Sequence, residues 1–81
     1  MTREEALSWI AGIFEEPVEN IKAETPREDI GAWDSIGVLN LIAAFDEKFS
    51  IQLSDEEVGQ MKTINDVLNI LEHRGILPAV A

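Results

Sequence analysis

Residues 33–50 read WDSIGVLNLIAAFDEKFS, and we expect the rest of the chain to fold around this stretch. Its large apolar residues recur at three- and four-residue steps, a spacing that puts side chains on one face of a helix. Burial of each such side chain stabilises a fold by roughly 1.5–3 kcal/mol. The stretch therefore predicts a core helix capped by Asp34, with an apolar body over residues 37–50. Its core-facing residues are Val38, Leu41, Ile42, Phe45 and Phe49.

The first helix is predicted over residues 3–16. Thr2 and Glu5 have the spacing of a capping box, in which each side chain accepts a hydrogen bond from the other residue's backbone N–H. Pro17 is placed to end this helix, because proline disfavours the helical conformation in the residue before it.

Two shorter helices are predicted after the core helix. Residues 54–57 read Ser-Asp-Glu-Glu, a second capping-box pattern, and open a short helix to about residue 61. Residues 63–66 begin a last helix, and Gly75 is of the type that ends helices in a left-handed conformation. No segment alternates as a strand would. We therefore expect an all-α fold and a single domain over residues 1–81.

Residues 17–33 form a long connection between the first two helices. Connections of this length are usually functional or disordered. Val18, Ile21 and Ile30 are spaced along it, which predicts a loop pinned to the core. Trp33 is expected to pack back on the core helix as a hydrophobic staple and so fix the angle at which the loop enters it.

Composition and charge exclude several classes of protein. The chain is 46% hydrophobic, which is ordinary for a globular fold, and without cysteine it has no disulfide or thiolate metal site. Its apolar runs are too short to cross a bilayer, and its start has no signal-peptide character, so we expect a cytoplasmic protein. Sixteen acidic against six basic residues give a net charge of −10, which repels nucleic acid and steers basic partners inward. On charge alone, the simpler interpretation is that acidity keeps a small domain soluble.

Ser35 is the leading candidate for a functional residue. It lies at the predicted start of the core helix, where unpaired backbone N–H groups and the helix dipole favour a phosphate group. Asp34 would cap the helix beside it. Asp-Ser is also a common helix start, and on the dipeptide alone the simpler interpretation, a solvated structural serine, is favoured.

A second apolar strip strengthens the functional interpretation. Ile36, Leu39 and Ala43 are spaced three and four residues apart and fall off the core-facing stripe. An aligned apolar set beside one hydroxyl indicates a docking surface. The alternative is that the first helix or the long connection covers these residues.

Other site chemistries fit the sequence poorly. The only histidine, His73, lies near the end of the last helix, where its charge suits the helix dipole, and nothing resembles a nucleophile elbow. We therefore predict no catalytic residue. The acidic pairs lie at helix starts or on polar faces and lack calcium-loop spacing, so we predict no metal site.

Residues 31–36, Gly-Ala-Trp-Asp-Ser-Ile, resemble the phosphopantetheine attachment motif of acyl carrier proteins, whose core is Asp-Ser followed by an aliphatic residue. Further matches lie upstream at residues 28–31 and downstream at 41–42, 45–47, 49–51, 55–56 and 63–67. The resemblance covers nearly the whole chain and is strongest from residue 28 to residue 71.

The resemblance implies a four-helix bundle in which a phosphopantetheinyl transferase attaches 4′-phosphopantetheine from coenzyme A to Ser35. The thiol of that arm would carry acyl intermediates as thioesters in fatty-acid or specialised, polyketide-like biosynthesis. Acyl-loading and acyl-processing enzymes with basic docking patches would be the partners, and we expect a monomer. The residues expected to contact partners are Ile36, Gly37, Leu39, Asn40, Ala43, Asp46 and Glu47. Those expected to line a cargo cavity are Val38, Ile42, Phe45, Met61, Ile64 and Leu68.

Two features depart from the common pattern of the family. Fatty-acid carriers usually have acidic residues two and five positions after the serine, where this chain has Gly37 and Asn40. The tryptophan directly before Asp-Ser, Trp33, resembles the motif of a subset of discrete carriers from specialised pathways. Both features weigh against the housekeeping carrier of fatty-acid synthesis. Two alternatives stay open: an aminoacyl or aryl carrier served by an adenylating enzyme, and an unmodified helical interaction module.

Overall fold

The computed structural model describes residues 1–77 and contains four α-helices. They are α1 (Arg3–Ile13), α2 (Ser35–Phe49), α3 (Asp55–Gly59) and α4 (Ile64–His73). Within the described residues there is no strand, only an isolated antiparallel bridge between Pro26 and Thr63. The predicted all-α fold is confirmed. Residues 78–81 of the predicted domain lie outside the described residues.

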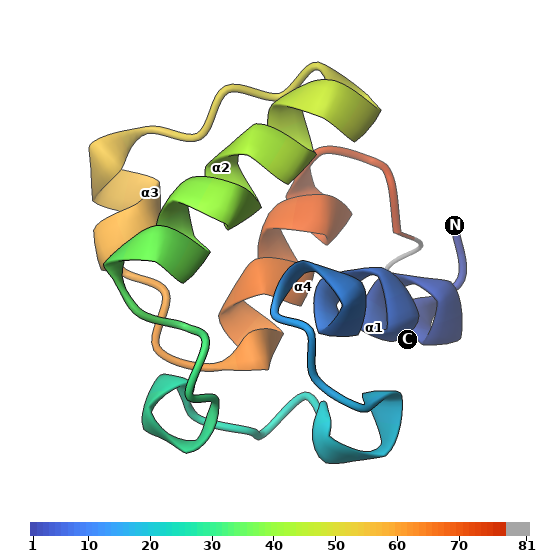
Figure 1. The fold of residues 1–81 in the computed structure, drawn as a ribbon. Coiled ribbons are helices and arrows are strands. Elements are labelled where there is room, and N and C mark those ends of the chain that lie inside the picture. Colours follow the sequence, from blue (N-terminus) through green and yellow to red (C-terminus); the bar gives the residue numbers. More distant parts are fainter. Residues whose placement is uncertain (78–81) are drawn as a thin grey trace.

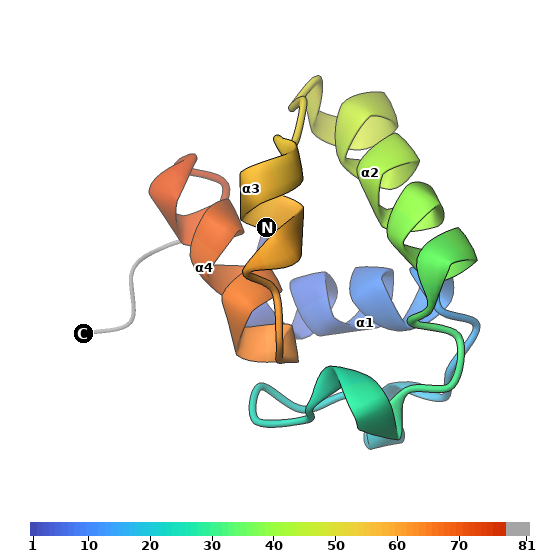
Figure 2. The same cartoon turned by 90° about the vertical axis from the view of Figure 1, so that its left-hand side faces the viewer.

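The helices pack around a common apolar interior. α4 lies between α1 and α2 in Figure 1, and the turned view of Figure 2 shows the short α3 between α2 and α4. The core draws on α1, α2, α4 and the connections, and no charged side chain is buried among the described residues. Leu41 and Phe45 are buried, as predicted, while Val38 and Phe49 are half-buried against the core and Ile42 is half-buried.

Aromatic side chains join α1 to α2. The Trp9 ring packs edge-on against Phe45 and Phe49, with centroids 5.2 and 5.1 Å apart. Such aromatic pairs contribute about 0.5–1.5 kcal/mol beyond the apolar area they bury. This contact fixes the orientation of the last turns of α2 against α1.

The predicted end of the first helix is wrong by three residues. α1 stops at Ile13 because Glu15 takes a left-handed conformation, with φ of 53°. The N–H of Glu16 then donates to the carbonyl of Ala11 at 2.9 Å, and the N–H of Glu15 donates to that of Gly12 at 3.3 Å. These two bonds form a Schellman motif, which ends the helix before Pro17 is reached.

The remaining helix ends follow the sequence more closely. The capping box of Thr2 and Glu5 is present, and so is that of Ser54 and Glu57. α3 ends two residues earlier than predicted, at Gly59. Gly75 has φ of 77° and ends α4 as predicted.

The long connection is pinned to the core and to the linker between α3 and α4. It contains two 3₁₀ turns, Val18–Asn20 and Arg27–Asp29, and lies at the bottom of Figure 1. Ile21 and Ile30 are each 2% exposed, which confirms them as anchors. Val18 is 47% exposed, so the prediction for this residue is wrong.

Backbone hydrogen bonds hold the connection in place. Arg27 N–H donates to the carbonyl of Lys62 at 2.8 Å, and Ile64 N–H donates to that of Thr25 at 3.0 Å. A third bond, 2.7 Å long, runs from Asn65 N–H to the carbonyl of Ala23. The loop that leads to Ser35 is therefore a packed part of the bundle.

Candidate functional site

Ser35 is the first residue of α2, and its side chain is exposed. The hydroxyl has no hydrogen-bond partner among the described residues. Asp34 caps the helix as predicted: its Oδ1 accepts the N–H of Ile36 at 3.0 Å and that of Gly37 at 2.9 Å. A hydroxyl at a helix start can bear a phosphodiester, because the dipole and the backbone N–H groups favour negative charge there.

Trp33 anchors the backbone just before the cap. It is 4% exposed, and its ring stacks on Phe14, the C-cap residue of α1, with centroids 5.1 Å apart and an interplanar angle of 21°. The sequence predicts that this ring packs back on its own helix. The partner is instead α1, because the loop enters α2 directly beside the C-terminal end of α1.

Arg27 adds a polar contact to this anchor. Its Nε–H donates to the backbone carbonyl of Trp33 at 3.1 Å. Its guanidinium carbon lies 5.9 Å from the centroid of the same indole ring, within cation–π range. Nothing local in the sequence indicates this contact, since the two residues lie six positions apart in the chain.

Gly37 is buried, unlike the other six residues predicted to contact partners. A Cβ atom built on Gly37 would overlap the carbonyl oxygen of Ala32 and lie 3.4 Å from Cε1 of Phe14. The absence of a side chain therefore lets the loop close onto the first turn of α2. The prediction that Gly37 contacts partners is therefore wrong, because Gly37 is a buried packing position.

The predicted apolar strip is open to solvent. Ile36 is 69% exposed and Leu39 64% exposed, and Ala43 is also exposed. Neither the first helix nor the long connection covers them, which was the alternative interpretation. Asn40, Asp46 and Glu47 are exposed on the same helix.

The six residues predicted to line a cargo cavity divide by burial. Phe45, Met61, Ile64 and Leu68 are buried in the core, and Val38 and Ile42 are half-buried on α2. Their role toward a cargo stays a prediction.

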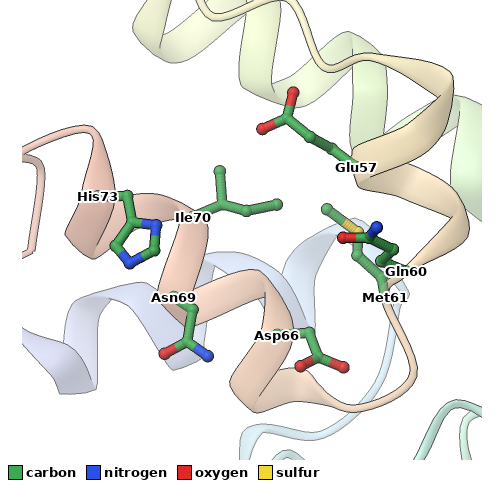
Figure 3. A pocket seen from close by; sticks show the side chains of 7 residues that line it. All are labelled: Glu57, Gln60, Met61, Asp66, Asn69, Ile70 and His73. Carbon is green, nitrogen blue, oxygen red and sulfur yellow. The ribbon is translucent and has the colours of Figure 1, made fainter.

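A hollow of about 300 Å³ lies between α3 and α4. Met61 is the one predicted cavity residue in its lining, and Figure 3 shows Met61 and Ile70 pointing toward one another across it. Glu57, Asp66 and His73 give the remaining wall a polar character. The other five residues predicted for the cargo cavity do not line this hollow.

A second hollow, of about 220 Å³, lies beside the start of α2. Its lining includes Phe14, Ala32, Asp34 and Gly37, residues of the contacts described above. The space therefore belongs to the surroundings of Ser35.

The carboxyl groups with a shifted pKa, those of Glu5 and Glu57, lie outside the surroundings of Ser35. The pKa of Glu57 is lowered, first by the backbone N–H of Ser54 and further by the side chains of Arg74 and Ser54. The pKa of Glu5 is lowered by the backbone and side chain of Thr2.

Over residues 1–77 there is no group of three His, Asp or Glu side chains that could hold a metal ion. None of the described helices is long and apolar enough to cross a membrane.

Comparisons with known proteins agree with this geometry. A family described as the phosphopantetheine attachment site matches residues 6–71. An acyl carrier protein of Trieres chinensis is 39% identical over 74 residues, which are 85% of this chain and 91% of that protein. One from Wolinella succinogenes is 42% identical over 55 residues, 67% of this chain and 71% of that protein. One from Bdellovibrio bacteriovorus is 36% identical over 58 residues, 70% and 73% of the two chains.

Proposed function

The chain belongs to the acyl carrier protein family, and we propose that Ser35 is the residue that bears its arm. The protein is a carrier and not an enzyme, and its covalent cofactor is 4′-phosphopantetheine. The observation that carries the assignment to Ser35 is its exposed hydroxyl, free of partners among residues 1–77, at the capped start of α2. Neither the aminoacyl or aryl carrier nor the unmodified module is favoured for a chain of this family.

The proposed modification is a phosphoryl-type transfer. Ser35 Oγ attacks the β-phosphorus of coenzyme A. The new Oγ–P bond replaces the P–O bond to 3′,5′-ADP, which leaves, and a base of the transferase takes the hydroxyl proton. Asp34 keeps the helix start formed, so that the product phosphodiester lies in the field of the helix dipole. Once attached, the arm supplies a thiol that carries acyl groups as thioesters.

We propose that partner enzymes dock on the exposed strip, defined as Ile36, Leu39 and Ala43. Asn40, Asp46 and Glu47 would contact them from the same helix. The net charge of −10 suits partners with basic patches, which it would attract at long range. The transferase and the acyl-loading and acyl-processing enzymes are partners of this kind.

We further propose one carrier domain over residues 1–81, acting as a monomer in the cytoplasm. A specialised, polyketide-like pathway fits better than housekeeping fatty-acid synthesis. The support is Gly37 and Asn40, which stand where the common fatty-acid carriers have acidic residues, together with Trp33.

Modification in vitro tests the proposed attachment site. The wild type, Ser35→Ala and Ser8→Ala are incubated with coenzyme A and a broad-specificity transferase. Ser8 is an exposed serine of α1, and its variant is the matched control. We expect one added phosphopantetheine on the wild type and on Ser8→Ala, and none on Ser35→Ala. Failure of several competent transferases to modify the wild type would refute the proposal.

A further inference from the structure

The segment that leads into Ser35 is held by side chains from other parts of the chain. Residues 32 and 33 contact α1, the second 3₁₀ turn and the first turn of α2. We propose that Arg27 is a positioning residue for phosphopantetheinyl transfer, which fixes Trp33 and thereby the direction of the Ser35 hydroxyl. This inference rests on the proposed function, because it concerns the same serine.

Arg27 contacts both the backbone and the ring of Trp33. Its Nε–H donates to the Trp33 carbonyl at 3.1 Å, and its guanidinium carbon is 5.9 Å from the ring centroid. The hydrogen bond is partly buried, which strengthens it relative to one in water. A lysine could supply charge at this position, but not a donor and a planar group at the same two places.

The place of Arg27 is itself fixed by the fold. Its backbone N–H donates to the carbonyl of Lys62 at 2.8 Å, next to the bridge between Pro26 and Thr63. The side chain therefore reaches Trp33 from a backbone that is tied to the linker before α4. Arg27 connects that linker to the residues that precede Ser35.

Two further contacts limit how residues 32–34 can move. The Trp33 ring stacks on Phe14 at 5.1 Å, and the Ala32 carbonyl rests against the bare Cα of Gly37. Asp34 alone separates Trp33 from Ser35, and its carboxylate is engaged with the N–H groups of Ile36 and Gly37. A shift of Trp33 therefore passes directly to the helix start.

Transfer to a serine depends on this direction because the oxygen must approach phosphorus in line with the leaving group. A displacement of about 1 Å can slow such a step by up to about 100-fold. A residue that only stabilised the fold would behave differently. Its loss would lower the melting temperature and leave the rate of the folded protein unchanged.

The test compares Arg27→Met with Arg3→Met. Both variants remove one positive charge from an arginine, and the Arg3 side chain, unlike that of Arg27, makes no hydrogen bond or cation–π contact to Trp33 among the described residues. Rates are measured in single turnovers with the transferase in saturating excess, below the melting temperature of every variant. The transferase concentration at half-maximal rate reports docking separately.

We expect Arg27→Met to lower the saturated rate about 5- to 20-fold, within the range that misplacement of a reacting group allows. The transferase concentration at half-maximal rate should change less than twofold. Arg27→Lys, which keeps a donor, should recover part of the rate, and Arg3→Met should match the wild type. If Arg27→Met does not fold at any temperature, it is left out of the comparison, and the saturated rate of Arg27→Lys decides, with about a threefold loss expected.

Two results would overturn the inference. One is a saturated rate of the folded Arg27 variant equal to that of Arg3→Met. The other is an unchanged saturated rate with a higher transferase concentration at half-maximal rate, which would make Arg27 a docking residue. Both leave the proposed function standing, since the wild type is modified in each. A wild type that is not modified at all refutes the proposed function, and the role of Arg27 with it.

Discussion

The carbonyl oxygen of Ala32 occupies the space that a Cβ atom on Gly37 would need. This contact closes the long connection onto the first turn of α2, directly beside Ser35. Ser35 is thus exposed, while the backbone on either side of it is packed. The arrangement gives a solvent-accessible hydroxyl a defined direction.

Gly37→Ala should destabilise the fold, although alanine is the better helix former. The added methyl group meets backbone, which cannot turn aside as a flexible side chain would. Overpacking of this kind costs about 1–3 kcal/mol, which urea denaturation would detect as a lower free energy of unfolding.

Gly12→Ala is the matched control, because a Cβ on Gly12 of α1 meets nothing within 4 Å. It should stabilise by up to about 0.5–1 kcal/mol through helix propensity alone. If both alanines stabilise equally, the packing described for Gly37 is wrong.

Glu15→Gly should stabilise the protein. Glu15 has φ of 53°, a conformation that costs an L-residue with a side chain roughly 1–2 kcal/mol and that glycine adopts freely. Allowing for the greater chain entropy of unfolded glycine, we expect a net gain of about 1 kcal/mol in thermal or urea unfolding. Glu15→Ala keeps the Cβ atom and should show no such gain. An equal gain from alanine would assign the effect to charge.

Glu57→Gln should weaken the protein at neutral pH but not in acid. The lowered pKa of Glu57 means that its carboxylate contributes stability above the ordinary glutamate pKa of about 4.3. That contribution is lost as the pH falls through the lowered value. Glutamine can still accept in the capping box with Ser54, so the variant removes only the charge.

The free energies of unfolding of the wild type and Glu57→Gln, obtained from urea denaturation, are compared from pH 7 down to pH 3. The difference at neutral pH should be below about 1 kcal/mol, since the Glu57–Arg74 pair is partly exposed, and it should close in acid. A difference that stays constant with pH would contradict the role of the charge. Arg74→Gln should remove only the part of the Glu57 contribution to stability that comes from the ion pair with Arg74.

Leu39→Gln separates docking from stability. Leu39 is 64% exposed, so its replacement should change the free energy of unfolding by less than about 0.5 kcal/mol. Loss of an apolar contact at a partner interface should nonetheless lower kcat/KM of the transferase by about tenfold, which corresponds to roughly 1.4 kcal/mol. Val18→Gln changes another exposed apolar residue, 47% exposed on the long connection, and should leave kcat/KM unchanged. Equal effects would argue against a docking strip on α2.

The features predictable from the sequence are those with local causes. The caps by Asp34 and Ser54 and the helix end at Gly75 depend on residues within one turn. Helical spacing places Ile36 and Leu39 off the core-facing stripe, and both are exposed in the structure. Ser35 is predictable as the candidate residue from the apolar strip beside it and from the resemblance of residues 31–36 to the attachment motif.

The missed features either lack the residue type that usually marks them or depend on contacts between different elements. Glu15 ends α1 without the glycine that usually marks such a position. The partners of Trp33, Phe14 and Arg27, belong to other elements, so its stacking on α1 has no local signal. The resemblance to carrier proteins puts Gly37 on the partner surface, and the loop carbonyl that covers it, that of Ala32, has no signal in the sequence.

The central claim is that Ser35 carries the phosphopantetheine arm, and the intact mass of the protein from its own cells tests it most directly. Fragmentation of the purified protein then locates the added group. We predict the mass of the chain plus one phosphopantetheine, with or without an acyl group, and the addition on Ser35. An unmodified mass, or an arm on any other residue, would contradict the account.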